Sequence, residues 1–276
     1  MAGLDPAIYV LEPSPQAWMP GTGPGRPDIR LTVMTIRQRA DRLLVERGLF
    51  ASRARAQAAI TAGLVTADGV VVRKPSEDIS SDATITAAPA HPYVSRGGVK
   101  LAAALDHFHI DVAGRVCLDV GASTGGFTDV LVGRGARRVY AIDVGRDQLH
   151  PSLHGRRQIV SIEATDIRAL DPARLREAPD FAVVDVSFIS LKHVLPSVGM
   201  LLPPRAAVVA LVKPQFEAQR RAVRKGVVRA AAVHRAVCDD IAAFLAAQGW
   251  QVGGLMRSPI LGGDGNAEFF VEARRG

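Results

Sequence analysis

A glycine-rich turn followed by an acidic residue is the part of the sequence best suited to bind a ligand. The turn, Gly121-Ala-Ser-Thr-Gly-Gly-Phe127, directly follows the apolar run 116–120, and Asp143 ends the next apolar run. Glycine permits a sharp turn and lets the backbone approach a ligand closely. An acidic residue at the end of the next strand can accept hydrogen bonds from a ribose diol. The order of these features predicts a site for an adenosine-containing cofactor.

The spacing of the glycines distinguishes between such cofactors. A nicotinamide-binding turn reads G-x-G-x-x-G, whereas this turn reads G-A-S-T-G-G and has Asp119 just before it. Both features are more usual for S-adenosylmethionine than for a pyrophosphate. A nicotinamide-dependent reductase and a purely structural turn without a ligand are the alternatives.

Ionisable residues also lie at the ends of the later apolar runs. Asp166 lies just past the run 159–162, where it could hydrogen-bond an adenine amino group. Asp185 and Lys213 end the fourth and fifth runs, and Glu268 precedes the last. Ligands collect at the carboxyl ends of strands in an open α/β sheet, and lysine is seldom buried without a partner. Each residue alone could be an ordinary strand-end polar group, but together they predict one reactive site.

The apolar runs that position these residues alternate with helical or loop segments. We expect strands at 116–120, 139–143, 159–162, 181–184, 207–211 and 269–272. Leu101, Leu105 and Phe108 recur at helical spacing, which predicts a helix that covers the sheet. Strands that alternate with helices indicate an α/β unit over residues 97–276, with a mostly parallel, doubly wound sheet.

A smaller α+β unit is expected at residues 35–89, followed by a linker at 90–96. It contains helical segments near 43–48 and 53–60 and two short strands, 64–66 and 70–72, joined by an Asp-Gly turn. Residues 1–34 are rich in proline and glycine, so we expect a disordered extension there. Met34 is an alternative translational start.

The charge of the chain favours a polyanionic partner. The formal net charge is +7 and the sequence pI is about 10.0. Cys117 and Cys238 lack a metal-like spacing, which favours reduced, buried thiols in a cytoplasmic protein. No apolar run is long enough to cross a bilayer, so we expect no stable membrane association. The sequence leaves the oligomeric state open.

These residues resemble a known enzyme family. Lys100, Asp185, Lys213 and Glu268 are similar in position to the Lys-Asp-Lys-Glu tetrad of the FtsJ-like ribose 2′-O-methyltransferases. The phrases at 95–101, 185–190 and 211–217 look closer to the TlyA branch, historically labelled haemolysins, which joins an RNA-binding domain to this methyltransferase. Residues 42–49 and 52–57 are similar to the domain named after small-subunit ribosomal protein four. The resemblance covers residues 35–273.

The resemblance implies a Rossmann-like class I methyltransferase that modifies a ribose, of cytidine in this family, in ribosomal RNA. A ribose 2′-hydroxyl is a poor nucleophile and must lose its proton as it attacks the methyl group. We expect Lys213 to take this proton, with Lys100 beside it, because a second lysine and partial burial favour a neutral amine. Asp185 and Glu268 would orient the two amines. No metal is required for this chemistry.

The same reasoning assigns residues to the cofactor and to the RNA. The residues expected to bind S-adenosylmethionine are Gly121, Ser123, Gly125, Phe127, Asp143, Asp166 and Asp185. Those expected to contact phosphates are Arg39, Arg42, Arg53 and Arg55 in the small unit, and Arg220, Arg221, Arg224 and Lys225 in a loop after Lys213. A solvated basic face is the alternative for both groups. The implied partner is ribosomal RNA or a ribosomal subunit, recognised mainly by shape.

Two features depart from the family pattern, and two other functions compete. Many TlyA relatives have Asn where this chain has Asp166, and the loop 218–225 is richer in arginine than usual.

One alternative function is that of an RNA-binding assembly factor with an inactive methyltransferase domain. The four filled tetrad positions argue against it. The other is a membrane-active haemolysin, which would require an amphipathic or spanning segment that the sequence lacks.

Overall fold

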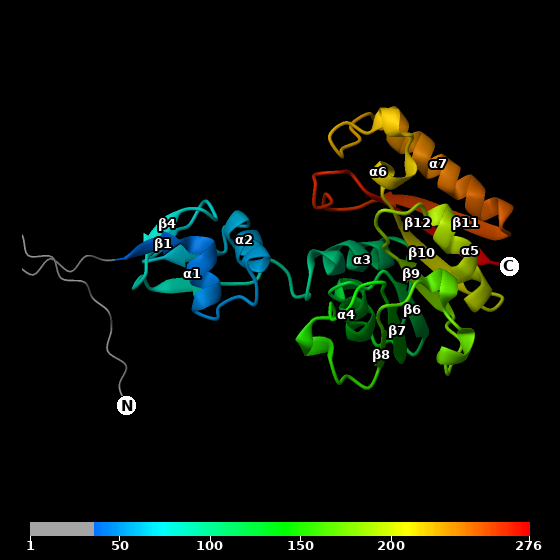
Figure 1. The fold of residues 1–276 in the computed structure, drawn as a ribbon, viewed down its shortest axis with the longest axis horizontal. Coiled ribbons are helices and arrows are strands. Elements are labelled where there is room, and N and C mark those ends of the chain that lie inside the picture. The colour runs from blue at the N-terminus through cyan, green and yellow to red at the C-terminus, as the bar shows by residue number, and fades with distance from the viewer. Residues whose placement is uncertain (1–35) are drawn as a thin grey trace, which may run out of the picture. The chain divides into compact units, whose positions relative to one another are not determined.

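A computed structural model describes residues 36–276 of the chain. These residues form two compact units that divide between Ala90 and His91 (Figure 1). The expected disordered extension at 1–34 and the alternative start at Met34 lie outside the described residues.

The first unit packs two helices against short antiparallel strands. Its elements are β1 (Arg37–Arg39), α1 (Ala40–Glu46), α2 (Arg53–Thr61), β2 (Val65–Ala67), β3 (Val70–Val71), β4 (Asp78–Ser80) and β5 (Ile85–Ala87). β1 pairs with β4, and β2 lies between β3 and β5. Leu44, Ile60 and Val65 are buried together in its core. The expected Asp-Gly turn joins β2 to β3, with Asp68 and Gly69 both at positive φ.

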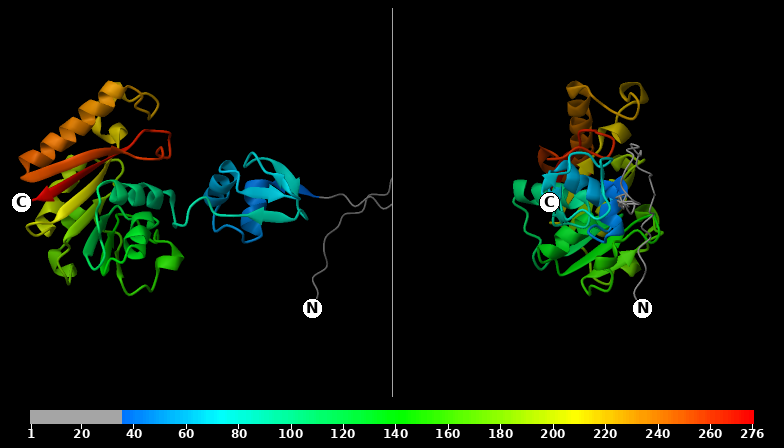
Figure 2. Two further views of the ribbon diagram at one scale, coloured as in Figure 1. Left: turned by 180° about the vertical axis from the view of Figure 1, so that it is seen from behind. Right: turned by 90° about the vertical axis from the view of Figure 1, so that its left-hand side faces the viewer.

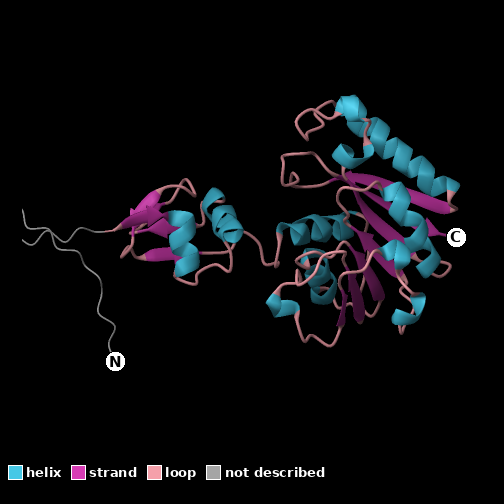
Figure 3. Ribbon diagram, viewed as in Figure 1, coloured by secondary structure: helices cyan, strands magenta, loops and turns pink. Residues whose placement is uncertain are grey.

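The second unit is built on one seven-stranded sheet with the strand order β11-β12-β10-β9-β6-β7-β8. Strands are coloured magenta in Figure 3. Its strands are β6 (Val116–Val120), β7 (Arg138–Ile142), β8 (Ile159–Ile162), β9 (Phe181–Val184), β10 (Ala207–Val212), β11 (Trp250–Arg257) and β12 (Phe269–Arg275). The five strands from β6 to β10 are parallel, whereas β12 runs antiparallel to β10, and β11 antiparallel to β12. The predicted α/β class with a mostly parallel, doubly wound sheet is confirmed.

Helices cover both faces of this sheet (Figure 2). The helices are α3 (Arg96–His107), α4 (Gly126–Gly133), α5 (Leu191–Leu201), α6 (Pro214–Glu217) and α7 (Ala231–Ala247), with 3-10 turns η1 (Pro151–Leu153), η2 (Ile167–Ala169), η3 (Pro172–Arg174) and η4 (Arg220–Ala222). Alternation along β6 shows why two layers form, because successive side chains point to opposite faces. Leu118 packs on the side of α5 and α7, and Cys117 packs on the side of α3 and α4.

Strand β11 was not expected from the sequence. Gly253 and Gly254 lie in its middle, and glycine disfavours strands. The register shifts between Val252 and Gly254, as in a β-bulge. A Cβ atom on Gly253 would clash with the carboxylate of Glu272, which is 3% exposed. Gly253 therefore makes room for a buried acid on β12, whereas Gly254 lies against the ring of Phe108.

The segment expected as a linker, 90–96, divides differently in the structure. Residues from His91 onward belong to the second unit, and α3 begins at Arg96. Tyr93 packs so closely over Gly98 that any side chain there would clash with its ring. The Val94 amide also donates a hydrogen bond to Asp129 Oδ2 at 3.0 Å. These contacts fix the start of α3, which carries Lys100.

Candidate functional site

The predicted cofactor residues gather at the carboxyl ends of the parallel strands. A cavity of about 590 Å³ opens there, and its walls come from the segments that follow β6, β7, β8 and β9. The predicted residues that line it are Gly121, Ser123, Asp143, Asp166 and Asp185. Open α/β sheets bind ligands at this edge. The cavity has the size of a small-molecule site.

The backbone at the turn requires glycine at two positions. Gly121 has φ +84, and a Cβ atom on it would clash with the carbonyl oxygen of Asp185. Gly125 has φ +89, and a side chain there would clash with Leu149 and Leu153. Only glycine adopts this conformation readily and lets the chain pass so closely. The turn therefore brings the end of β6 against the end of β9.

Two of the expected cofactor residues do not line the cavity. Phe127 is 3% exposed and belongs to the core beneath α3 and α4, where its ring lies 6.2 Å from that of Phe270. Gly125 is the left-handed N-cap of α4 and faces Leu149 and Leu153. Both residues therefore shape the turn from behind, and their expected part in cofactor binding stays a prediction.

Asp143 ties the end of β7 to the glycine turn. Its Oδ2 accepts a hydrogen bond from the Ser123 amide at 2.8 Å, and its Oδ1 accepts one from the Gly145 amide at 2.7 Å. Each carboxylate oxygen can accept more than one hydrogen bond. The carboxylate is thus held in place at the cavity wall with accepting capacity left for a diol.

Asp166 lies at the same cavity but has a strong partner of its own. Its carboxylate accepts hydrogen bonds from Arg168 Nε and Nη2, the latter at 2.6 Å. The guanidinium of Arg168 holds the pKa of Asp166 below its usual value. The carboxylate also caps η2 by accepting from the Arg168 amide. A hydrogen bond to an adenine amino group would therefore share an acceptor that is already engaged.

Two lysine–carboxylate pairs form beside the cavity. Lys213 Nζ lies 2.6 Å from Asp185 Oδ1 in an ion pair that does not have the geometry of a hydrogen bond. The same ammonium donates a hydrogen bond to Ser187 Oγ at 2.8 Å. Lys100 Nζ donates to Glu268 Oε2 at 2.5 Å. Lys100 is 8% exposed and Glu268 is 3% exposed, so this second pair is buried.

The sheet register explains how these pairs meet at one edge. Val212 on β10 pairs with Phe269 on β12, so Lys213 and Glu268 are the next residues on adjacent strands. Asp185 follows β9, which is the parallel neighbour of β10. The amino end of an antiparallel strand thus returns to the edge where the parallel strands end. Two amines and two acids are assembled there from four separate segments.

Comparison with known proteins identifies the two units. Residues 93–275 match the model of the FtsJ-like methyltransferase family, and residues 38–85 match that of the S4 domain. The chain belongs to the FtsJ-like methyltransferase family. It is a methyltransferase with an S4 domain N-terminal to its catalytic unit in the sequence, as the sequence motifs predicted.

Several relatives share both units of this FtsJ-like methyltransferase. YqxC of Bacillus subtilis, which carries the name of an rRNA methyltransferase, is 46% identical over 239 residues, which are 85% of each chain. The 16S/23S rRNA (cytidine-2′-O)-methyltransferase TlyA of Mycobacterium tuberculosis is 42% identical over 87% of this chain and 91% of its own. A solved hemolysin-labelled structure from Streptococcus thermophilus is 41% identical, with a TM-score of 0.70 over 87% of this chain and 88% of the other.

Beneath the glycine turn, the methyltransferase carries a buried acid that the sequence reasoning did not use for chemistry. Asp119 is fully buried, and its Oδ2 accepts a hydrogen bond from Thr128 Oγ1 at 2.6 Å. Its Oδ1 has no hydrogen-bond partner among the described residues. Burial raises the pKa of Asp119 to about 7, and the charges of Asp185 and Asp143 add to this effect. The acid therefore keeps its proton in mildly acidic solution and ionises near neutral pH.

The predicted RNA-binding arginines of the S4 domain fall into two groups. Arg39 and Arg53 both donate to the buried carboxylate of Asp41, which also accepts from Gln57. Hydrogen bonds from Arg39 lead the interactions that lower the pKa of Asp41. Within residues 36–276, Arg42 and Arg55 form no ion pair. Arg39 and Arg53 thus tie β1 and α2 to α1, whereas Arg42 and Arg55 are left without a protein counter-charge.

The basic loop of the catalytic unit is exposed, as its sequence suggested. We call residues 220–229 the basic hairpin, because Arg224 and Val227 form an antiparallel bridge there. Lys225 and Gly226 connect them at φ +50 and +77, which is the left-handed geometry of a two-residue turn. Its exposed cationic residues are Arg220, Arg221, Arg224, Lys225 and Arg229.

Sequence reasoning missed three residues at the mouth of the site. Ser187 accepts the hydrogen bond from Lys213. Phe188 is 91% exposed at φ +64, and its ring lies 5.1 Å from that of Phe216 on α6. An exposed phenylalanine in a left-handed conformation is unusual, and such outliers often mark functional positions. The signal in the sequence was an aromatic residue three positions beyond the strand-end Asp185.

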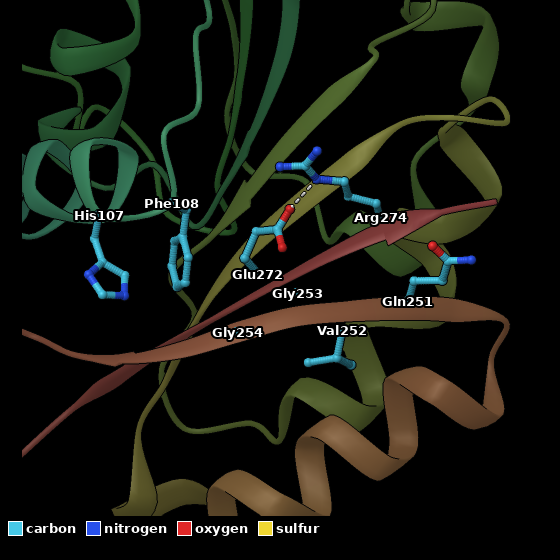
Figure 4. A pocket seen from close by; sticks show the side chains of 8 residues that line it. All are labelled: His107, Phe108, Gln251, Val252, Gly253, Gly254, Glu272 and Arg274. Atoms are coloured by element: carbon cyan, nitrogen blue, oxygen red, sulfur yellow. Dashed lines mark hydrogen bonds and ion pairs between the residues drawn. The ribbon is translucent and has the colours of Figure 1, made fainter.

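A second cavity, of about 480 Å³, contains none of the predicted site residues (Figure 4). It lies between the end of α3, at His107 and Phe108, and strands β11 and β12. Glu272 faces this cavity, and its Oε1 accepts a hydrogen bond from Arg274 Nε at 2.7 Å.

Residues 36–276 contain no group of three or more His, Cys, Asp and Glu side chains that could hold a metal ion. No helix in this part of the chain is long and apolar enough to cross a membrane.

Proposed function

We propose that the protein transfers a methyl group from S-adenosylmethionine to a ribose 2′-hydroxyl of ribosomal RNA, with Lys213 as the general base. The observation that carries this proposal is the pairing of Lys213 with Asp185 and Ser187 at the edge of the cavity. The names of YqxC and TlyA support ribosomal RNA as the substrate, and the name of TlyA supports cytidine as the target.

The cavity residues fit S-adenosylmethionine. Gly121 leaves the floor of the cavity free of a side chain, and Asp143 offers carboxylate oxygens that suit the ribose diol. Val144 is 72% exposed at the cavity wall and provides an apolar surface for the adenine ring. Bound S-adenosylmethionine supplies a methyl group on a positively charged sulfur, which is open to attack by an oxygen.

The contacts of Lys213 suit a base that must be aimed. A neutral lysine amine has two N–H bonds and one lone pair. One N–H bond can point to Ser187 Oγ, and the Asp185 carboxylate lies on another side of the amine, with its Oδ1 2.6 Å from Nζ. The lone pair is then directed at a third position, where it can take the proton of a ribose 2′-hydroxyl. As the 2′-oxygen bonds to the methyl carbon, the bond from that carbon to sulfur would break and neutral S-adenosylhomocysteine would leave. The hydroxyl proton moves to Nζ, and Asp185 stabilises the ammonium that forms.

Lys100 and Glu268 are proposed to complete the site. Their buried ion pair places a fixed dipole at the edge where the ribose must lie. The Lys100 ammonium can donate to the 2′-oxygen and orient it towards the methyl carbon. Alignment of this kind supplies much of the rate in a direct transfer between two bound groups.

The surface around the mouth suits a single RNA nucleotide that leaves its stack. Phe188 and Phe216 offer aromatic faces beside Ser187 and Lys213. Stacking on an aromatic ring stabilises an unpaired base and accepts any base. The basic hairpin, together with Arg42 and Arg55 of the S4 domain, supplies cations for phosphate groups. The proposed partner is thus a structured ribosomal RNA, in a cytoplasmic enzyme.

Transfer of a labelled methyl group from S-adenosylmethionine to ribosomal subunits and to naked ribosomal RNA tests this function. Lys213→Ala should bind the cofactor but lose transfer by a factor of about 100 or more. Lys192→Ala is the matched control, because Lys192 also pairs with an aspartate, Asp240, at 2.6 Å but does not line the cavity. Full activity in Lys213→Ala would exclude its role as base.

The product identifies the modified atom. Alkaline hydrolysis of RNA needs a free 2′-hydroxyl, so a 2′-O-methyl group leaves one resistant linkage at the modified nucleotide. Methyl label found on a base would contradict ribose transfer. A wild-type protein that binds RNA and cofactor but transfers no methyl group to either substrate would support the non-enzymatic assembly factor instead.

A further inference from the structure

A buried asparagine connects the basic hairpin to the loop that carries Glu268. Asn266 is 1% exposed and lies two residues before Glu268. Its side-chain Oδ1 accepts a hydrogen bond from the Val228 amide at 3.0 Å, and its Nδ2 donates to the Gly226 carbonyl at 2.9 Å. The side-chain amide of Asn266 therefore pairs with two backbone groups of the hairpin, the Gly226 carbonyl and the Val228 N–H.

The loop around Asn266 is itself held tightly to the catalytic acid. The Asn266 carbonyl accepts from the Gly262 amide at 2.9 Å, and the Gly265 amide donates to the Gly262 carbonyl at 3.0 Å. A side chain on Gly262 would clash with the Glu268 carboxylate. The loop thus closes over the acid that pairs with Lys100, and Asn266 projects from this closed loop to the hairpin.

The hairpin is also anchored from a second side. Val228 is 2% exposed, and its carbonyl oxygen lies 2.9 Å from His234 Nε2 on α7. The His234 ring packs 5.4 Å from the ring of Phe269, the residue that follows Glu268. The N–H and the C=O of Val228 are therefore both fixed to groups that flank the catalytic acid.

We infer that Asn266 is a positioning residue that sets the distance between phosphate groups held by the basic hairpin and the ribose that lies at Lys100 and Glu268. This inference rests on the proposed function. The cations of the hairpin are exposed on long side chains and supply binding, but they cannot by themselves fix a register. The amide of Asn266 supplies the fixed connection, because it joins the hairpin backbone to the loop of a reacting-site residue.

Substitutions in the hairpin cations and at Asn266 should affect different properties, namely RNA affinity and substrate alignment. Loss of a hairpin cation should weaken RNA binding and reduce its dependence on salt, because fewer counterions are released. Loss of Asn266 leaves every cation in place, so the salt dependence of binding should stay the same. The turnover rate at saturating RNA should fall by about 10- to 100-fold, because a misplaced substrate loses alignment with the acceptor site.

The test uses the full-length protein with ribosomal RNA and labelled S-adenosylmethionine. Asn266→Ala should lower kcat while leaving cofactor affinity and the salt slope of RNA binding unchanged. Arg224→Ala should raise KM and reduce the salt slope while keeping most of kcat. Gln158→Ala, which removes an exposed amide elsewhere, is the matched control and should change none of these quantities.

Two further measurements keep the test decisive if Asn266→Ala is poorly stable. His234→Phe removes the contact to the Val228 carbonyl from the other side and should lower kcat in the same way. Hydrogen exchange of residues 223–228 should become faster in both variants, which reports the loss of the anchor without any activity.

The outcomes separate this inference from the proposed function. An active wild type with unchanged kcat in Asn266→Ala and His234→Phe would overturn the inference alone. A loss of cofactor affinity or a general loss of folding in both variants would also overturn it, because the role would then be structural. Absence of methyl transfer by the wild type would instead contradict the proposed function.

Discussion

Lys100 and Glu268, which are 168 positions apart in the sequence, form a buried ion pair with 2.5 Å between Nζ and Oε2. Both charged groups are buried, and each is stabilised electrostatically by the other. Removal of one partner from a buried pair costs about 3–5 kcal/mol, whereas replacement of both by apolar residues is often neutral. The pair therefore offers a way to separate stability from activity.

Glu268→Gln should lower the free energy of unfolding of the catalytic unit by about 3 kcal/mol, because Lys100 keeps its charge without a carboxylate. The double variant Lys100→Met with Glu268→Leu should recover most of this loss, yet it should transfer no methyl groups. Urea unfolding and the methyl-transfer assay measure the two effects. A double variant that recovers activity along with stability would show that the pair has no part in the chemistry.

Asp119 should make the folded protein less stable as the pH rises from about 4 to about 7. The unfolded side chain ionises near 3.8, whereas the folded one keeps its proton up to about 7. Between these values the unfolded state binds fewer protons, so higher pH favours unfolding, by at most about 4 kcal/mol in total. Above pH 7 this contribution is constant.

Asp119→Asn cannot ionise and should flatten this part of the pH dependence. The difference in unfolding free energy between the variant and the wild type, measured at pH 5, 6, 7 and 8, isolates the contribution from other titrating groups. Fluorescence of Trp250 in a Trp18→Phe background reports on the catalytic unit. A difference that does not change between pH 5 and 8 would contradict a raised pKa at Asp119.

Asp143→Ala should weaken the binding of S-adenosylmethionine by about 10- to 100-fold. The substitution removes a charged acceptor for the ribose diol, and such hydrogen bonds contribute about 1.5–3 kcal/mol. It also frees the amides of Ser123 and Gly145. Titration calorimetry measures the effect, with Asp147→Asn at an exposed position as the control. Equal affinity in Asp143→Ala and the wild type would remove the diol contact from the proposal.

Asp41→Ala should destabilise the S4 domain by about 2–4 kcal/mol, because Arg39, Arg53 and Gln57 lose a common buried acceptor. The pKa of Asp41 is lowered in the fold, so its stabilising effect is present above its ordinary pKa of 3.8 and is lost as the pH falls further. Hydrogen exchange in α1 and α2 should therefore differ between variant and wild type at pH 7 and converge towards acid pH. Asp78→Ala, at an exposed position, is the control.

Phe188→Ala should lower kcat/KM for RNA by about 10-fold or more, because stacking of one base on an aromatic ring contributes about 1–3 kcal/mol. Phe188→Trp should retain activity, since the larger ring also stacks. Both variants are compared in the methyl-transfer assay with Met200→Ala, which removes another exposed apolar side chain from the same unit. If Phe188→Ala and Met200→Ala lower kcat/KM to the same extent, the Phe188 ring does not stack on a nucleotide base of the RNA.

Much of the catalytic fold could be predicted because its strands carry local signals. The apolar runs ending at Asp143, Asp185 and Lys213 are short, buried and separated by helical segments, so they indicate parallel strands. Parallel strands in one sheet end at one edge, and the residues that follow them must meet there. The placement of Asp143, Asp166 and Asp185 around one cavity follows from this rule alone.

Other features could not be predicted because they depend on contacts between distant segments. β11 contains Gly253 and Gly254, and its pairing with β12 outweighs their low strand propensity. Phe127 lies in the sequence motif of the turn, but the first turn of α4 directs its ring into the core. The hydrogen bonds of Asn266 to the basic hairpin depend on where the loop before β12 lies, which no local sequence pattern indicates.

The reversal of β12 has a consequence for how the enzyme is made. Lys100 is synthesised early, on the helix that opens the catalytic unit, whereas its counter-charge arrives only with the final strand. Until that strand adds to β10, a nascent or truncated chain holds an amine at the protein interior with nothing to neutralise it. The Lys100–Glu268 ion pair can therefore form only after the last strand is in place. Under the proposed function, a chain that lacks this strand would transfer no methyl group.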